Sequence, residues 1–247
     1  MRNIWTIAKR EYKIYFSSPL AYIVMLIILS VIGAIFALNL INLTSNPFGQ
    51  NQAPDISIVT GPMAFLLVFS VPALTMRLLA DEQRMGTLEL MLTAPVRDWE
   101  LVVGKWLGSF LFVLTIIAIT FVFPFVLNTM VTPGIDQQMM LSSYLGIILV
   151  AAAFLSIGVS ISAMFSNQFA AFFLSMGLLV ILWFLIGIPA QILFTGGGIF
   201  DYLNMNSRFY NSMNQGIINL SDIVYFLSVT ALGLFIGSIA TESRRWR

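Results

Sequence analysis

The chain has 247 residues, of which 59% are hydrophobic and only 9% are charged. Soluble proteins average about 45–50% apolar and about 25% charged residues, so this composition indicates an integral membrane protein. The sequence contains no cysteine and no histidine. This excludes disulfide bonds, zinc sites built on thiolate or imidazole, and catalysis by a cysteine or a serine–histidine pair. The net charge of +1 gives no general attraction to nucleic acid.

Stretches without charged residues predict six membrane-spanning helices in a single transmembrane domain, residues 1–247. A spanning helix needs about 20 mostly apolar residues. The runs that meet this requirement give spans at about 20–42, 62–80, 106–130, 142–165, 169–193 and 222–240. The first span is longer than the apolar part of a cleaved signal peptide, so we expect it to be retained. The predicted fold class is therefore all-α and integral to the membrane.

The basic residues predict the orientation of the chain. Six spans place both termini on one side, and 11 of the 12 Lys and Arg residues fall on that side, Arg208 being the exception. The positive-inside rule assigns that side to the cytoplasm. We therefore expect a multi-pass protein of a bacterial or archaeal cytoplasmic (inner) membrane, with both termini in the cytoplasm. The longest external segment, 194–221, is rich in asparagine, whose amide is costly to bury in hydrocarbon.

Residues 3–17 predict an amphipathic helix that lies in the membrane interface. One side is mostly aromatic and the other is basic, the two sets being Trp5, Ala8, Tyr12 and Tyr15, and Lys9, Arg10 and Lys13. Pro19 then favours the first turn of the following span. A basic segment that only sets the topology is an equally good interpretation of this pattern taken alone.

The cytoplasmic loop at 81–100, between spans two and three, predicts a short helix with apolar side chains. Gly86 interrupts any continuous helix, Thr87 is a suitable cap for a new one, and the apolar residues Leu88, Leu90, Met91 and Leu92 follow. Pro95 ends this helix, and Asp98 is expected to cap the helix of span three. Apolar residues next to charges suggest a protein-docking surface. An interfacial helix that rests on lipid is the alternative.

The spans lack several features that would indicate other functions. No charged residue lies in the middle of a predicted span, which argues against a proton relay or a voltage sensor. There is no G-x-x-x-x-G-K-[ST] motif, so any energy from ATP has to come through another subunit. The chain is therefore not expected to be an enzyme. Small residues on span four predict close helix packing, and they are Ala151, Ala152, Ser156, Ser160 and Ala163.

The loop and the start of span three contain a spaced motif, made of Glu82, Gly86, Thr87, Glu89, Leu92, Thr93, Pro95, Gly104 and Lys105. It has the form E-x-x-x-G-T-x-E-x-L-x-(T/S)-x-P, followed by a G-K pair that opens the third span. This motif resembles the cytoplasmic motif of ABC-2 class export permeases. Six spans, the N-terminal helix and the external stretch 207–225 agree with the same family. Within it, the chain is most similar to the branch of the gliding-motility-associated and copper-processing permeases.

The resemblance implies two permease chains, identical or paralogous, that pair with two separate ABC-type ATPase subunits. These subunits would bind the ATP and Mg²⁺, and this chain would hold no cofactor or metal. The N-terminal helix and the loop helix would sit on the ATPases, the latter as a coupling helix. The implied coupling residues are Glu82, Gly86, Thr87, Leu88, Glu89, Leu92 and Pro95, and the interface helix would contribute Trp5, Lys9, Arg10 and Tyr12.

The leading hypothesis is the permease subunit of an ATP-driven exporter that moves an unknown substrate. The alternative is a membrane anchor that transmits force within an envelope machine and moves no solute. The six-span pattern is the same in both cases. ATPase activity measured with and without candidate substrates separates them.

Overall fold

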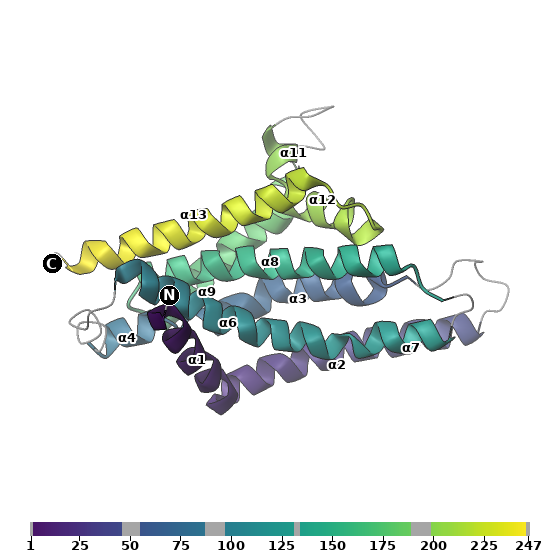
Figure 1. Cartoon of the computed structure of the whole chain (residues 1–247), viewed down its shortest axis with the longest axis horizontal. Helices are drawn as coiled ribbons and strands as arrows, with labels where there is room; N and C mark the ends of the chain where they lie inside the picture. Colours follow the sequence, from purple (N-terminus) through teal and green to yellow (C-terminus); the bar gives the residue numbers. More distant parts are fainter. Residues whose placement is uncertain (1, 46–54, 87–96, 131–133, 189–198, 246–247) are drawn as a thin grey trace.

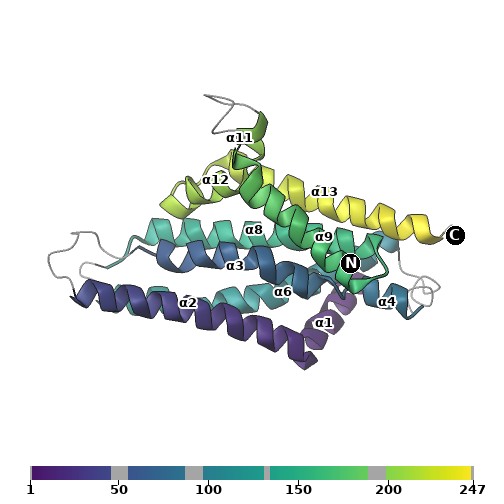
Figure 2. The same cartoon turned by 180° about the vertical axis from the view of Figure 1, so that it is seen from behind.

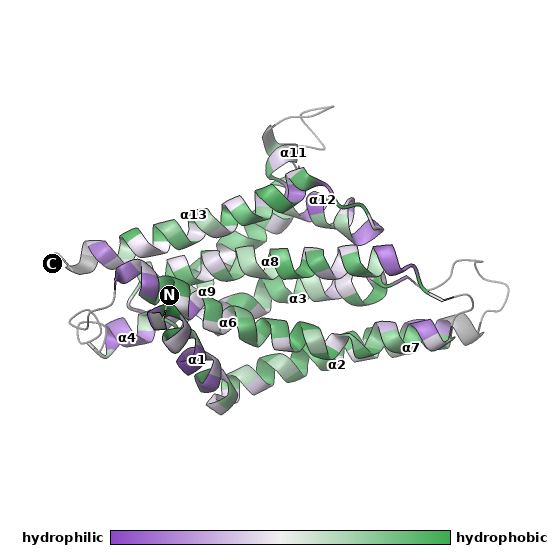
Figure 3. Cartoon of the chain, in the orientation of Figure 1, coloured by the Kyte–Doolittle hydropathy of each residue, from purple (hydrophilic) through white to green (hydrophobic). Residues whose placement is uncertain are grey.

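The chain forms one elongated bundle of helices (Figure 1). The computed structural model describes residues 2–45, 55–86, 97–130, 134–188 and 199–245, and all regular secondary structure in these ranges is helical. Six helical segments are long and apolar enough to cross a membrane, namely Pro19–Asn42, Ser57–Arg84, Asp98–Met130, Gln137–Met164, Gln168–Leu185 and Leu220–Ser243. Hydrophobic residues run along the bundle and hydrophilic residues gather near its ends (Figure 3). The predicted all-α, six-span fold is confirmed.

The two ends of the bundle differ in the helices and the charged residues found there. Helix α1 (Arg2–Ser17) begins and α13 (Leu220–Arg245) ends at one end, where α4 (Ala80–Arg84) also lies (Figures 1 and 2). We call this the basic end, because α1 and the segment around α4 bring most of the lysines and arginines to it. The opposite end, where α7 (Val122–Met130) finishes, is called the far end.

Helix α1 leads into the first span through a sharp change of direction (Figure 1). Its last turn closes at Ser18, whose backbone N–H donates to the carbonyl of Tyr15 over 3.1 Å. Pro19 is the first residue of α2 (Pro19–Ser45), as the sequence predicts. The Tyr22 hydroxyl donates back to the carbonyl of Phe16 over 2.8 Å and so fixes the angle between the two helices.

Helix α8 (Gln137–Met164) is the core of the bundle, since 83% of its most apolar 18 residues are buried. It packs against α3 (Ser57–Thr75) and α13 through small side chains. A Cβ placed on Gly158 would lie 2.9 Å from the Cβ of Thr75, and the Ser160 hydroxyl donates to the carbonyl of Gly233. The close packing predicted for the small residues of span four is therefore confirmed.

The third span consists of two helices, α6 (Asp98–Thr120) and α7, with a break at Phe121. Pro124 explains the break, because proline has no N–H to donate to the carbonyl four residues earlier. That carbonyl belongs to Thr120, and the buried hydroxyl of Tyr144 on α8 donates to it over 3.0 Å. The proline therefore bends the span without leaving a buried carbonyl unpaired.

The segment after the fifth span packs on the far half of the bundle. The span is α9 (Gln168–Val180) continued by the π-helix η1 (Ile181–Leu185), and the next described elements are α11 (Ile199–Leu203), α12 (Met205–Tyr210) and η2 (Met213–Gln215). Ser142 of α8 donates to the carbonyl of Met213 over 2.6 Å, and Thr60 of α3 donates to the side chain of Asn214 over 2.6 Å. The buried asparagine amide, whose desolvation is costly, thus has a partner.

Arg208 and Asp222 form an ion pair that joins α12 to the start of α13. The two side chains are 2.5 Å apart and are 12% and 5% exposed. The guanidinium lies between two tyrosine rings, 4.3 Å from the centroid of Tyr202 and 4.6 Å from that of Tyr225. The second carboxylate oxygen of Asp222 accepts from the Ser212 hydroxyl over 2.5 Å. The Asp222 carboxylate therefore joins the start of α13 to Arg208 on α12 and to Ser212, which follows α12.

Candidate coupling site at the basic end

Helix α1 crosses α6 at two glycines that allow the backbones to approach closely. A Cβ on Gly104 would lie 2.8 Å from the Cβ of Ile7. A Cβ on Gly108 would lie 2.6 Å from the Cβ of Glu11 and 2.9 Å from the carbonyl oxygen of Ala8. Both distances are shorter than van der Waals contact, so α1 fits against α6 only where α6 has no side chain.

We expect Gly108→Val to destabilise the protein by about 1–3 kcal/mol, the usual cost of adding methyl groups to a closely packed contact. The valine would collide with the main chain of α1, which has to move away from α6. Thermal unfolding in detergent checks this result. Gly177→Val on α9 is the control, because nothing lies within 4 Å of a Cβ at that glycine. Equal effects of the two substitutions would contradict a close crossing at Gly108.

A buried ion-pair cluster lies beside this crossing. The Nζ of Lys105 is 3.0 Å from the Oε1 of Glu11 on α1 and 2.7 Å from the Oε1 of Glu82 on α4. The Lys105 side chain is 2% exposed, and those of Glu11 and Glu82 are 7% and 12% exposed. A buried ammonium requires such partners, because removing it from water is costly. Lys105 therefore connects α1, α4 and α6 through a single charged group.

Two further sets of hydrogen bonds hold these helices to the rest of the bundle. The Ser162 hydroxyl of α8 accepts from the backbone N–H groups of Leu79 and Ala80 over 3.1 and 3.2 Å. The Tyr15 hydroxyl of α1 donates to the carbonyl of Leu74 over 3.0 Å. Burial, and to a lesser degree the neighbouring Glu11 carboxylate, raises the pKa of the Tyr15 hydroxyl above its usual value. Helices α1 and α4 are therefore anchored to the core as well as to Lys105.

The structure describes two of the predicted coupling residues. The side chain of Glu82 is directed into the protein toward Lys105, so it is not an exposed charge. Gly86 follows α4 with φ +68°, a left-handed conformation that favours glycine, and it is at the predicted helix break. The other predicted coupling residues lie outside the described residues and are Thr87, Leu88, Glu89, Leu92 and Pro95.

The predicted residues of the interface helix are found on the outer side of α1. Trp5 is 57% exposed, Lys9 and Arg10 are exposed, and Tyr12 is half-buried. The opposite side of α1 packs on α6 and is where Glu11 and Tyr15 lie, both of them buried. The aromatic residues predicted to share one stripe are thus divided between a buried and an exposed side.

The start of the third span differs from the sequence prediction. Asp98 was expected to cap this helix, but the residue at the cap is Arg97 and Asp98 is the first helical residue. The Oε2 of Glu100 accepts from the backbone N–H of Arg97 over 3.2 Å, which is the return half of a capping box. The sequence predicts Lys105 just before the span. In the structure it lies inside α6 and is buried.

Sequence analysis did not identify Glu11 and Lys105 as partners. A signal for Glu11 was present, since it is the only acidic residue of α1 and lies among basic ones. It is also four residues before Tyr15 and three after Ala8, which places it on the side of α1 that packs against α6. An isolated carboxylate on that side requires a buried cation, and Lys105 of α6 supplies it.

Comparisons with known proteins identify the family. The sequence profile described as "ABC-2 family transporter protein" matches residues 5–241, nearly the whole chain. A search of curated proteins found no match. The match is to the family as a whole and supports neither the gliding-motility nor the copper-processing branch. Together with the six apolar helices, it identifies a multi-pass protein of the cell membrane. The chain belongs to the ABC-2 transporter family and is a membrane subunit of an ABC transporter.

Proposed function

We propose that this chain is the permease subunit of an ATP-driven exporter and that its basic end receives the movement of a separate ATPase. Two copies of the chain, or this chain and a paralogue, would pair with two ATPase subunits that bind the ATP and Mg²⁺. The buried cluster of Glu11, Lys105 and Glu82 is the observation that carries the proposal, because it joins α1, which is expected to meet the ATPase, to the two helices that flank segment 87–96.

The proposed orientation places the basic end in the cytoplasm. The positive-inside rule favours this arrangement, since the lysines and arginines of α1 and of the segment around α4 gather at that end. An ATPase supplied with cytoplasmic ATP would then meet α1 and the segment between α4 and α6. The far end, where α7 finishes, would face the outside.

The arrangement supports a mechanism for transmitting force. The coupling segment 87–96 connects α4 to α6, and Lys105 ties both of these helices to α1. A push on the segment would therefore move α4, α6 and α1 together instead of bending one loop. Helix α4 continues from α3 and packs on α8, so the movement would reach spans two and four. In this mechanism Glu82 positions α4 and does not contact the ATPase.

We expect Glu89→Arg to abolish co-purification of a P-loop ATPase with the tagged chain. The substitution reverses the charge that the coupling helix would present to its partner, and such changes at a docking surface weaken association strongly. Immunoblotting or mass spectrometry of the purified complex measures the result. Glu242→Arg is the matched control, because it reverses an exposed carboxylate near the end of α13, outside the coupling segment.

Three outcomes of this experiment are informative. Loss of the ATPase in Glu89→Arg alone supports the proposed docking site. Loss in both variants would indicate a general effect of charge at the basic end and would contradict a specific site. A stable wild-type chain that purifies without any ATPase would overturn the proposed function. Substrate-stimulated ATPase activity of the complex then distinguishes an exporter from a force-transmitting anchor.

A further inference from the structure

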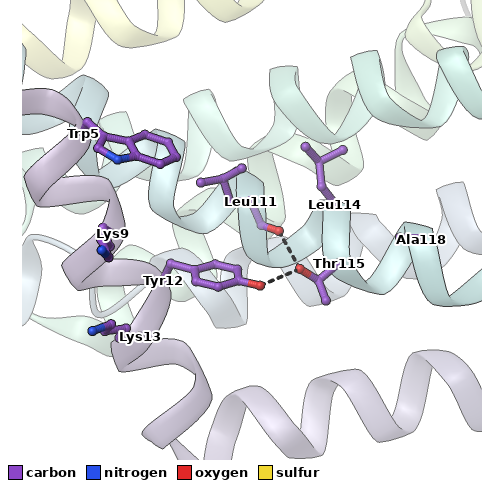
Figure 4. Close-up of a pocket in the computed structure, with 8 residues that line it drawn as sticks. All are labelled: Trp5, Lys9, Tyr12, Lys13, Leu111, Leu114, Thr115 and Ala118. Atoms are coloured by element: carbon purple, nitrogen blue, oxygen red, sulfur yellow. Dashed lines mark hydrogen bonds between the residues drawn. The ribbon is translucent and has the colours of Figure 1, made fainter.

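An open groove lies between the outer side of α1 and the exposed face of α6 (Figure 4). Its volume is about 620 Å³, and it is lined by side chains of both helices. Figure 4 shows the rings of Trp5 and Tyr12 extending from α1 toward α6, with Lys9 and Lys13 along α1 beside them. One wall of the groove is therefore cationic and aromatic, and the other is the apolar side of a spanning helix.

The cationic wall has no anion within the described part of the protein. Lys9 and Lys13 are exposed, and neither forms an ion pair with a described carboxylate. They are four residues apart on one helix, a spacing at which like charges repel each other. The only acidic residue of α1, Glu11, is turned to the opposite side and is committed to Lys105. An anion bound from outside would relieve this repulsion.

The other wall is suited to a hydrocarbon chain. Leu111, Leu114 and Ala118 follow one another along a single side of α6, over about 10 Å at 1.5 Å per residue. The one hydroxyl of this wall belongs to Thr115. It lies 3.1 Å from the Tyr12 hydroxyl and donates to the carbonyl of Leu111 over 2.9 Å, so the polar groups satisfy one another. What remains for a ligand is an apolar surface on α6 that faces the Trp5 and Tyr12 rings, with Lys9 and Lys13 on the α1 side of the groove.

We propose that this groove binds one anionic phospholipid of the leaflet at the basic end. Its phosphate would lie at Lys9 and Lys13, and one acyl chain would follow α6 past Leu114 to Ala118. Trp5 and Tyr12 belong to the residue types that favour the headgroup level of a membrane. The assignment to the inner leaflet rests on the orientation proposed for the chain. The groove and its charges do not depend on that orientation. The bound lipid would fill the angle between α1 and α6.

Native mass spectrometry of the detergent-solubilised protein tests this proposal, with phosphatidylglycerol as the anionic probe and phosphatidylcholine as the neutral one. We expect wild type to retain one phosphatidylglycerol preferentially. The double variant Lys9→Gln and Lys13→Gln is expected to bind it roughly 30-fold less tightly, since each basic residue near a membrane surface contributes a factor of about five. Arg77→Gln with Arg84→Gln is the control, because it removes the same charge from exposed positions outside the groove.

A second variant tests the apolar wall without changing any charge. Ala118→Trp is expected to fill the end of the groove and to weaken phosphatidylglycerol binding while both lysines remain.

Equal losses in the lysine and arginine double variants would overturn the proposal in favour of diffuse surface charge. Unchanged lipid binding in the lysine variant, with loss of the co-purified ATPase, would assign the lysines to protein docking instead. Lipid binding is measured on the permease alone, so its failure is distinct from failure of the proposed function.

Discussion

Replacing Lys105 by methionine is expected to lower the free energy of unfolding by about 3–5 kcal/mol, the cost of removing one partner from a buried ion pair. The substitution leaves the carboxylates of Glu11 and Glu82 close together with no cation between them. Both side chains are nearly inaccessible to water, at 7% and 12% exposure, so solvent does little to compensate. The contacts of α1 and α4 with α6 would then be weakened, while their hydrogen bonds to the core remain.

Chemical or thermal unfolding in detergent micelles measures this effect. Arg84→Met is the control, because it exchanges an exposed cation at the same end for the same side chain and is expected to change stability by less than about 0.5 kcal/mol. The triple variant with Glu11→Met and Glu82→Met added should recover most of the loss, since apolar residues of similar volume often replace a buried ion pair at little cost. A Lys105→Met protein as stable as wild type would contradict the buried cluster.

The second large effect is expected where α12 meets α13, since Asp222→Ala should also cost about 3–5 kcal/mol. The substitution removes the carboxylate that pairs with Arg208 and accepts from Ser212. It leaves a guanidinium that is 12% exposed between two tyrosine rings with no counter-ion. It also removes an acidic residue from the first turn of α13, where the helix dipole favours negative charge.

The control for this prediction is Asp136→Ala, at the start of α8. Asp136 is an exposed helix cap whose side chain accepts from the backbone N–H groups of Gln138 and Met139. Loss of such a cap typically costs about 1 kcal/mol. Unfolding measurements should therefore separate the two aspartates clearly. If Arg208→Met with Asp222→Ala were no more stable than Asp222→Ala alone, the unpaired guanidinium would not be the source of the loss.

Most of the fold could be predicted because the membrane restricts it. Runs of apolar residues without charge have one stable form in lipid, the spanning helix, and six such runs give the six helices found. The ends of the helices were harder to predict, since polar residues extend them beyond the apolar part. The span predicted at 62–80 is a helical segment that begins at Ser57, and the span predicted at 106–130 begins at Asp98.

The candidate site could be predicted only where its residues are close in sequence. Gly86 ends a helix by a local conformational requirement, so the sequence alone indicates it. The cluster around Lys105 depends on residues that are 94 and 23 positions away, and periodicity gives no information about such pairs. The resemblance implies Glu82 as a coupling residue, but the sequence does not indicate where its side chain points. Its actual direction depends on how α4 packs against α6 and α8.

The distance in sequence between Glu11 and Lys105 also has a consequence for biosynthesis. Helix α1 leaves the ribosome before the surface that it packs against, because Lys105 of the third span follows Glu11 by 94 residues. At 5–20 residues per second, α1 waits on the order of 10 s before Lys105 is made. During that time the carboxylate of Glu11 lacks its buried partner, and the cost of desolvating it favours a position of α1 at the membrane surface. The insertion of span three is thus the step that allows the N-terminal helix to dock.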